Sequence, residues 1–163
     1  RSPSRGLGDV YKRQKHANKG GYVLGICNGF QILIEMGLIP GALIRNSGLK
    51  FLCKSPELKV ETQDSVFTAN YSRFERIKIP VAHHDGNYFL SEKQLEALRD
   101  EDRVAFRYLN DLNGSVDGIA GVLSSNRRIL GMMPHPERAM NGLTGSSDGQ
   151  ALFRALVELT GAA

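Results

Sequence analysis

Cysteine and histidine are the residue types in this sequence best suited to attack and protonate a carbonyl group, and the chain has two cysteines and four histidines. Cys27 stands between two glycines in the stretch Gly25-Ile26-Cys27-Asn28-Gly29, with an apolar run on either side. A nucleophile on a sharp strand-to-helix turn needs small neighbours, as in the G-x-S-x-G pattern of serine hydrolases. The stretch therefore predicts such a turn, with the Cys27 sulfur at a helix N-terminus, where the helix dipole favours the reactive thiolate.

The same turn predicts a hydrogen-bond donor for the substrate. The backbone N–H of Asn28 would point toward the carbonyl under attack and supply one half of an oxyanion hole. A free cysteine is usually a small buried hydrophobic residue, and Cys53 lacks flanking glycines. We therefore assign Cys27 as the nucleophile and expect a structural role for Cys53.

His135 is the histidine best placed by its neighbours to act as a base. It follows an apolar run in Met133-Pro134-His135-Pro136-Glu137, where two prolines restrict the backbone around it. On an extended backbone, Glu137 would lie on the same side as His135 and accept a hydrogen bond from one ring nitrogen, leaving the other to face the sulfur. A His-x-Glu pair is weak evidence alone, but together with the cysteine turn it predicts a catalytic triad.

The other histidines carry weaker signals. We expect His16 to be solvated at a polar helix end. His83 and His84 follow an extended segment, and adjacent residues of a strand point to opposite sides. A packing role in a loop is the favoured interpretation for this pair, with metal ligation as the alternative.

An α/β domain would position these residues. Apolar spacing predicts strands over residues 22–26, 58–62, 104–109, 118–123 and 129–133, and an extended segment over 77–81 that Pro80 places at a sheet edge or at a strand end. It predicts helices over residues 15–19, 30–36, 91–98 and near the C-terminus, with Ser91 and Gln94 as a capping box and Ser147 or Asp148 as the last cap. Residues 45–56 are predicted to be loop. Strand–helix units at both ends and an antiparallel-looking middle indicate an α/β fold with a β insertion.

Composition narrows the class of protein. With 163 residues, 41% hydrophobic and 23% charged, the chain suits one globular domain. Four basic residues and one acidic residue fall within residues 1–14, so most of the net charge of +4 is in a tail, which argues against a nucleic-acid groove. No apolar run reaches the roughly 20 residues of a membrane span, and no zinc-type cysteine spacing occurs. We expect a cytoplasmic protein without metal, nucleic-acid or membrane binding.

Four stretches resemble the class I, triad-type glutamine amidotransferases: GGYVLGICNGFQIL (20–33), PVAHHDGNY (80–88), NDLNGSVDGIAGVLS (110–124) and GMMPHPERAM (131–140). Within that family, GICNGFQ and MMPHPERA are most similar to the glutaminase subunit of phosphoribosylformylglycinamidine synthase. The resemblance runs from about Lys15 to the C-terminus. It implies a flavodoxin-like glutaminase domain with a mostly parallel sheet and a β insertion.

The resemblance also implies roles for individual residues. Cys27 would be the nucleophile, His135 the base and acid, and Glu137 the group that orients His135. Gln31 and the turn Asn113-Gly114-Ser115 would contact the substrate glutamine. The reaction would pass through a Cys27 thioester and release ammonia.

The resemblance further implies partners. A separate synthetase subunit would use the ammonia to make formylglycinamidine ribonucleotide in purine biosynthesis, and a small accessory subunit would join the complex. We expect no cofactor in this chain, because ATP and magnesium would bind the synthetase.

Residues 1–14 do not resemble the family. We expect them to be a disordered or foreign leader ahead of a partial domain, residues 15–163, that lacks the opening strands and the Gly-rich loop of the family. On that interpretation the chain has little glutaminase activity by itself. Three alternatives stay open: another class I amidotransferase or a γ-glutamyl hydrolase, a non-catalytic subunit with the same fold, and a cysteine peptidase.

Overall fold

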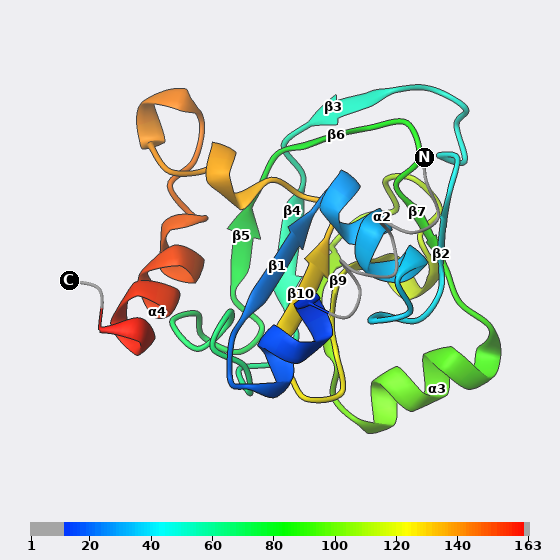
Figure 1. The fold of residues 1–163 in the computed structure, drawn as a ribbon. Helices are drawn as coiled ribbons and strands as arrows, with labels where there is room; N and C mark the ends of the chain where they lie inside the picture. The colour runs from blue at the N-terminus through cyan, green and yellow to red at the C-terminus, as the bar shows by residue number, and fades with distance from the viewer. Residues whose placement is uncertain (1–11, 162–163) are drawn as a thin grey trace.

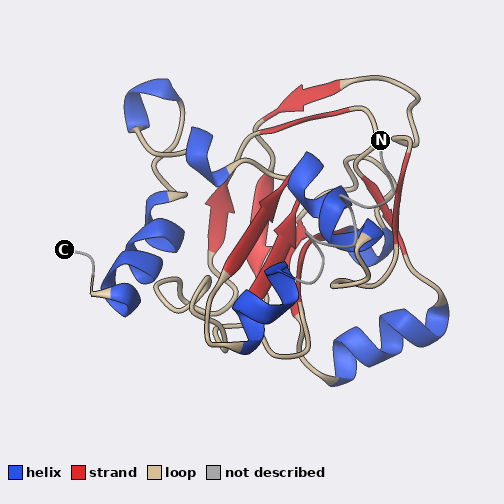
Figure 2. Ribbon diagram, in the orientation of Figure 1, coloured by secondary structure: helices blue, strands red, loops and turns tan. Residues whose placement is uncertain are grey.

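The computed structural model describes residues 12–161 of the chain. A six-stranded sheet in the order β1-β10-β9-β8-β4-β5 forms its centre, with two two-stranded sheets, β2-β7 and β3-β6, beside it (Figures 1 and 2). The strands are β1 Val23–Ile26, β2 Ala42–Ile44, β3 Leu52–Lys54, β4 Glu57–Val60, β5 Arg76–Lys78, β6 Val81–His83, β7 Asn87–Phe89, β8 Val104–Tyr108, β9 Ile119–Leu123 and β10 Ile129–Met132. The helices are α2 Asn28–Glu35, α3 Glu92–Asp100 and α4 Gln150–Thr160, with short 3-10 turns η1 Val116–Gly118, η2 Pro136–Arg138 and η3 Gly142–Thr144.

The central sheet is mixed and mostly antiparallel, so the expectation of a mostly parallel sheet is wrong. Among its described strands, only β1 and β10 pair in parallel; the other neighbours are antiparallel. A short connection explains the antiparallel pairing of β9 with β10. The turn between β9 and β10 spans residues 124–128, and the N–H of Ser124 donates to the Ile129 carbonyl across it at 2.9 Å. A tight turn of this kind reverses the chain, whereas a parallel neighbour requires a long crossover.

Two apolar clusters cover opposite faces of the sheet, because side chains alternate along a strand. In β10, Ile129 belongs to the cluster that contains Phe30 of α2, and the next residue, Leu130, belongs to the cluster that contains Leu152 of α4. Gly131 again faces α2, where a Cβ would lie 2.4 Å from Phe30 Cδ2. Helix α2 therefore lies close against β1 and β10, as Figure 1 shows.

Several local predictions are confirmed and two are wrong. Helix α3 begins with the predicted capping box of Ser91 and Gln94, and β5 lies at the sheet edge. The segment predicted to be loop contains β3, because Leu52–Lys54 pairs with β6. Helix α4 begins after Gly149 without a side-chain cap. The Asp148 carboxylate instead accepts the Lys78 N–H at 2.7 Å, which ties the start of α4 to β5.

The predicted leader lies partly outside the described residues, which begin at residue 12. Residues 12–18 form a helix, so the last three positions assigned to the leader belong to a helix that continues into the predicted domain. Within residues 12–161, no helix has the length and apolar character to cross a membrane.

Candidate active site

Cys27 occupies a strained position between β1 and α2. Its φ is 54° and its ψ is −106°, a positive-φ conformation that non-glycine residues rarely adopt, and such strained conformations cluster at functional sites. The sheet and the helix hold it there: the Cys27 N–H donates to the Met132 carbonyl at 2.8 Å, and the Cys27 carbonyl accepts the Gln31 N–H at 3.3 Å. The backbone thus presents the side chain at the end of β1, on the sharp turn that the sequence predicted.

The two glycines of the turn differ in what they do. A Cβ on Gly25 would lie 2.4 Å from Leu33 Cδ1 and 2.7 Å from the Gly29 carbonyl oxygen. Only glycine lets β1 and α2 approach this closely at that point. A Cβ on Gly29 would meet no described atom within 4 Å. Close packing of strand on helix therefore explains the first glycine and not the second.

Burial raises the pKa of the Cys27 thiol and so works against the thiolate that the helix end was expected to favour. A hydrogen bond from the Asn28 backbone N–H and the positive charge of Arg138 act in the opposite direction, and burial outweighs both. The Cys27 thiol donates a hydrogen bond to the Ala82 carbonyl oxygen, which lies 3.7 Å from the sulfur. The raised pKa and this contact favour the thiol over the thiolate, so a base beside the sulfur would assist its attack on a substrate.

His135 is held beside Glu137 with one ring nitrogen free. Its Nδ1 lies 2.5 Å from Glu137 Oε1, and because a carboxylate only accepts, Nδ1 is the donor. Nε2 is buried and has no hydrogen-bond partner among the described residues. Pro136 begins the 3-10 turn η2, so the pair meets across a tight turn and not, as predicted, along extended backbone. A neutral His135 in this tautomer carries its lone pair on Nε2.

A cavity of about 290 Å³ opens beside Cys27. It is lined by Cys27, Asn28, Gln31, Phe51, Ala82, His83, His84, Asp85 and Met133. Gln31, predicted to bind substrate, lies on this wall, and its amide donates to Glu35 Oε1 at 3.2 Å. His135 and Glu137 follow Met133 along the chain and are not themselves in the lining.

The predicted substrate-binding turn Asn113-Gly114-Ser115 does not line this cavity. The Asn113 amide donates to the Gly86 carbonyl at 2.7 Å, and Ser115 Oγ accepts the Tyr88 N–H at 3.1 Å. The turn is therefore placed behind the loop that follows β6, where it holds that loop against the cavity.

Two features of the cavity were not predicted as functional. The pairing of β3 with β6 brings Phe51 to its mouth, where the ring contacts His84 with centroids 5.4 Å apart. His83, assigned to loop packing, is 4% exposed and lies in the cavity wall. Its presence in the stretch PVAHHDGNY, which carries the family resemblance, was the available signal. Among the described residues, no group of three or more His, Cys, Asp or Glu side chains is arranged to hold a metal ion.

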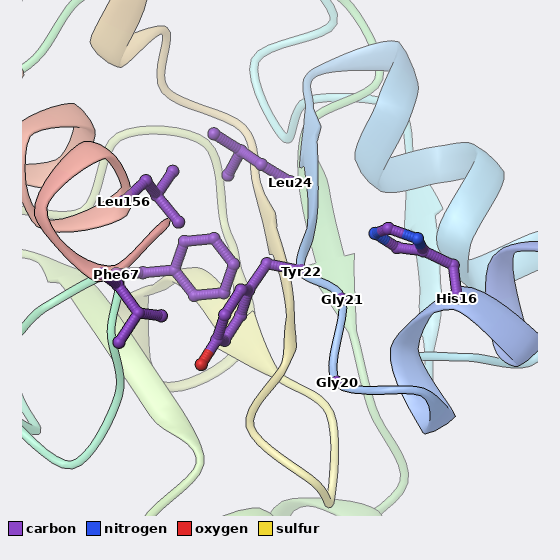
Figure 3. Close-up of a pocket in the computed structure, with 8 residues that line it drawn as sticks. His16, Gly20, Gly21, Tyr22, Leu24, Phe67 and Leu156 are labelled. Atoms are coloured by element: carbon purple, nitrogen blue, oxygen red, sulfur yellow. The ribbon is translucent and has the colours of Figure 1, made fainter. Parts of the chain in front are cut away.

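A larger cavity of about 700 Å³ lies elsewhere in the molecule (Figure 3). Tyr22, Leu24, Phe67 and Leu156 form its apolar side, and the rings of Tyr22 and Phe67 meet edge to face at 5.9 Å. It contains neither cysteine and shares no lining residue with the Cys27 cavity. The larger cavity thus lacks the strained cysteine, which is the feature that makes the smaller cavity the candidate site.

Comparison with known proteins agrees with this geometry. The family model of the CobB/CobQ-like glutamine amidotransferase domain matches residues 11–157. The phosphoribosylformylglycinamidine synthase subunit PurQ of Roseobacter denitrificans is 62% identical over 86% of this chain and 64% of its own length. The same subunit of Cereibacter sphaeroides is 58% identical over 88% of this chain and 64% of its own length. The chain thus spans about 64% of the length of these relatives.

Solved structures with a similar fold include related proteins. The structure of PurLQS from Thermotoga maritima matches with a TM-score of 0.83 and 43% identity, over 93% of this chain and 68% of that one. The glutaminase domain of CTPS from Trypanosoma brucei shares the fold at a TM-score of 0.60 and 12% identity, over 97% of this chain and 68% of that one. The family match covers nearly the whole chain and includes the cysteine turn and the His135–Glu137 pair. This chain therefore belongs to the family of CobB/CobQ-like glutamine amidotransferase domains.

Proposed function

We propose that this chain carries the glutamine-hydrolysing site of a phosphoribosylformylglycinamidine synthase. The observation that carries the proposal is the strained Cys27 turn at the end of β1, because the parallel neighbour β10 ends beside it and leads into the His135–Glu137 pair. The relatives named PurQ, at 62% and 58% identity, support the choice of synthase over other amidotransferases. Cys27 is the nucleophile in this proposal, His135 the base and acid, and Glu137 the group that orients His135.

The first half of the reaction forms a thioester. His135 Nε2 takes the Cys27 thiol proton, and the sulfur attacks the side-chain amide carbon of glutamine. The Asn28 backbone N–H donates to the oxyanion of the tetrahedral intermediate. His135 then gives its proton to the amide nitrogen, the carbon–nitrogen bond breaks, and ammonia leaves.

The second half returns the enzyme to its starting state. Water attacks the thioester carbon while His135 Nε2 takes a proton from it. The carbon–sulfur bond breaks, the sulfur regains a proton, and glutamate leaves. The Glu137 carboxylate stabilises the imidazolium that forms twice in the cycle.

The ammonia has a defined user in this proposal. A synthetase subunit receives it and, with ATP and magnesium bound to that subunit, converts formylglycinamide ribonucleotide to the amidine. A small accessory subunit completes the assembly. The similarity to a chain of the structure named PurLQS supports an assembly of this kind.

An electrophilic analogue of glutamine tests the proposed nucleophile. We expect a glutamine chloroketone to alkylate Cys27, with the adduct located by peptide mass spectrometry. The Cys53→Ser variant should label like the wild type, and Cys27→Ala should not label. An adduct confined to Cys53, or none, would contradict the proposal and favour a non-catalytic subunit.

A further inference from the structure

His83 is a buried histidine in the wall of the Cys27 cavity with one ring nitrogen unused. The side chain is 4% exposed, and it shares the cavity with Cys27 and Asn28. Its Nε2 has no hydrogen-bond partner among the described residues. A buried polar atom without a partner is costly, so pairing this nitrogen with a donor on a ligand would be favourable.

Asn46 determines which nitrogen of His83 carries the proton. Asn46 Nδ2 lies 2.7 Å from the His83 carbonyl oxygen and 2.9 Å from the Lys50 carbonyl oxygen. Both of these atoms only accept, so this end of the Asn46 amide must be the NH2 group.

The other end of the Asn46 amide then faces His83. Asn46 Oδ1 accepts the Gly86 N–H at 3.1 Å and lies 3.0 Å from His83 Nδ1. An amide oxygen only accepts, so Nδ1 must carry the hydrogen. A neutral ring has one hydrogen, and His83 Nε2 is therefore a bare acceptor.

The surroundings favour the neutral ring. Burial lowers the pKa of His83, and the nearby His135 lowers it further, while a hydrogen bond with the residue's own backbone and the charge of Asp85 act in the opposite direction without outweighing burial. Its Nδ1 partner is a neutral amide, which offers no charge to stabilise an imidazolium. The Asp85 carboxylate is paired with Arg45 at 3.6 Å on the exposed rim of the site.

We infer that His83 is a substrate-binding residue whose Nε2 accepts an N–H of the side-chain amide of glutamine and so distinguishes glutamine from glutamate. This inference rests on the proposed function and adds a specificity residue to it. The amide of glutamine carries two N–H donors, whereas the ionised carboxylate of glutamate carries only acceptors. A bare nitrogen therefore attracts the substrate and repels the product. Hydrolysis removes the donor, which favours release of glutamate.

Protection of Cys27 from iodoacetamide measures this preference without requiring turnover. The full chain is treated with the reagent in the presence of increasing glutamine or glutamate, and the modification of each cysteine is followed by mass spectrometry. A ligand or an acyl group on the sulfur blocks alkylation at Cys27. The exposed Cys53 reports reagent reactivity in the same sample.

Two variants distinguish the roles of the two ring nitrogens of His83. In His83→Asn, the amide can still donate to Asn46 but has no atom at the position of Nε2. We expect the protection midpoint for glutamine, the concentration that halves alkylation of Cys27, to rise about tenfold in this variant, which corresponds to the loss of roughly one hydrogen bond. The protection midpoint for glutamate should stay within about twofold of the wild-type value. In His83→Gln, the side-chain oxygen can reach the position of Nε2. Glutamine should then protect within about threefold of wild type, and glutamate should protect better than in wild type, because the amide can turn its NH2 toward a carboxylate.

The controls make each outcome decisive. His16→Asn, which changes an exposed histidine outside this cavity, should leave both midpoints unchanged, and thermal unfolding identifies any variant that fails to fold. Equal shifts for glutamine and glutamate in both His83 variants, or no shift in either, would overturn the role of His83 while leaving the proposed function intact. If neither ligand protects wild-type Cys27, the proposed function itself fails and the role of His83 fails with it.

Discussion

Two buried imidazoles near Cys27 have the same hydrogen-bond pattern and different partners. Each bonds through Nδ1 and leaves Nε2 without a partner among the described residues. His135 bonds to the Glu137 carboxylate at 2.5 Å, and His83 bonds to the Asn46 amide at 3.0 Å. A carboxylate stabilises a positive ring, whereas a neutral amide does not. We therefore interpret the first ring as the one that gains and loses a proton and the second as a fixed acceptor.

We interpret the difference to mean that the partner of a histidine, and not its burial, decides its chemistry. His135 and His83 are 9% and 4% exposed, so burial alone would assign them the same role. The charge on the Nδ1 partner separates proton transfer from recognition. Four changes test this comparison, beginning with the largest expected effect.

Loss of the His135 ring should have the largest effect. In His135→Ala, no group remains to take the Cys27 proton, and we expect glutamate release to fall by about 10⁴-fold or more. The measurement is glutamate formed from saturating glutamine with the synthetase partner present. His16→Ala is the control. A loss of less than about tenfold would show that another base serves Cys27.

Replacing the carboxylate with an amide should make the two histidines alike. In Glu137→Gln, His135 keeps a possible acceptor and loses the negative charge that stabilises its imidazolium. We expect glutamate release to fall by roughly 10²–10⁴-fold, with the thermal unfolding midpoint little changed. Full activity in this variant would remove the basis of the comparison.

The strained turn must hold Cys27 in place for either histidine to act on a bound substrate. In Gly25→Ala, the new Cβ would lie 2.7 Å from the Gly29 carbonyl oxygen, and we expect a loss of about 1–3 kcal/mol in the free energy of unfolding. The matched change Gly29→Ala places a methyl group in open space and removes a glycine from α2. It should be neutral or stabilising by up to about 1 kcal/mol. Chemical denaturation measures both, and equal destabilisation would refute the packing account of the turn.

The charge on Arg138 should have the smallest effect. This charge lowers the pKa of the Cys27 thiol while burial raises it. In Arg138→Ala, the pKa should rise further and the thiolate fraction at pH 8 should fall. Because Arg138 is half exposed, solvent screens its charge, and we expect Cys27 alkylation to slow by about two- to threefold.

The pH dependence of Cys27 alkylation shows in which direction the loss of the Arg138 charge moves the pKa of the thiol. A thiol with a raised pKa should react faster with each step in pH up to and beyond pH 9, and the Arg138→Ala profile should lie to the alkaline side of wild type. Arg154→Ala, on α4, is the control. A profile displaced to the acidic side would show that Arg138 does not act on the sulfur through its charge.

Local sequence signals predicted the turn at Cys27 well, because its causes lie within a few residues. Gly25 is required by contact with Leu33 and Gly29, which are near neighbours along the chain. The capping box at Ser91 is local in the same sense. Whether neighbouring strands run parallel or antiparallel could not be predicted from such local signals. Sheet order depends on pairings between distant segments, such as β1 with β10, and apolar spacing does not determine them.

Contacts between distant segments also limited what the sequence could predict about the cavity. The spacing of His135 and Glu137 suggested their contact, although the 3-10 turn between them was not predicted. The role of His83 depends on Asn46, which lies 37 positions away along the chain. No pattern within either segment reveals that hydrogen bond. The bond decides whether the histidine is a packing residue or an acceptor, so its interpretation required the structure.

Trapping the thioester tests the central claim most directly. The chain is mixed with glutamine, quenched in acid within the first turnover, and digested, and the peptide containing Cys27 is examined by mass spectrometry. We predict a γ-glutamyl group on Cys27, lost on treatment with hydroxylamine and absent from Cys53 and from the Cys27→Ser variant. Glutamate formed in a burst while Cys27 stays unmodified, or an acyl group on any other residue, would contradict the account.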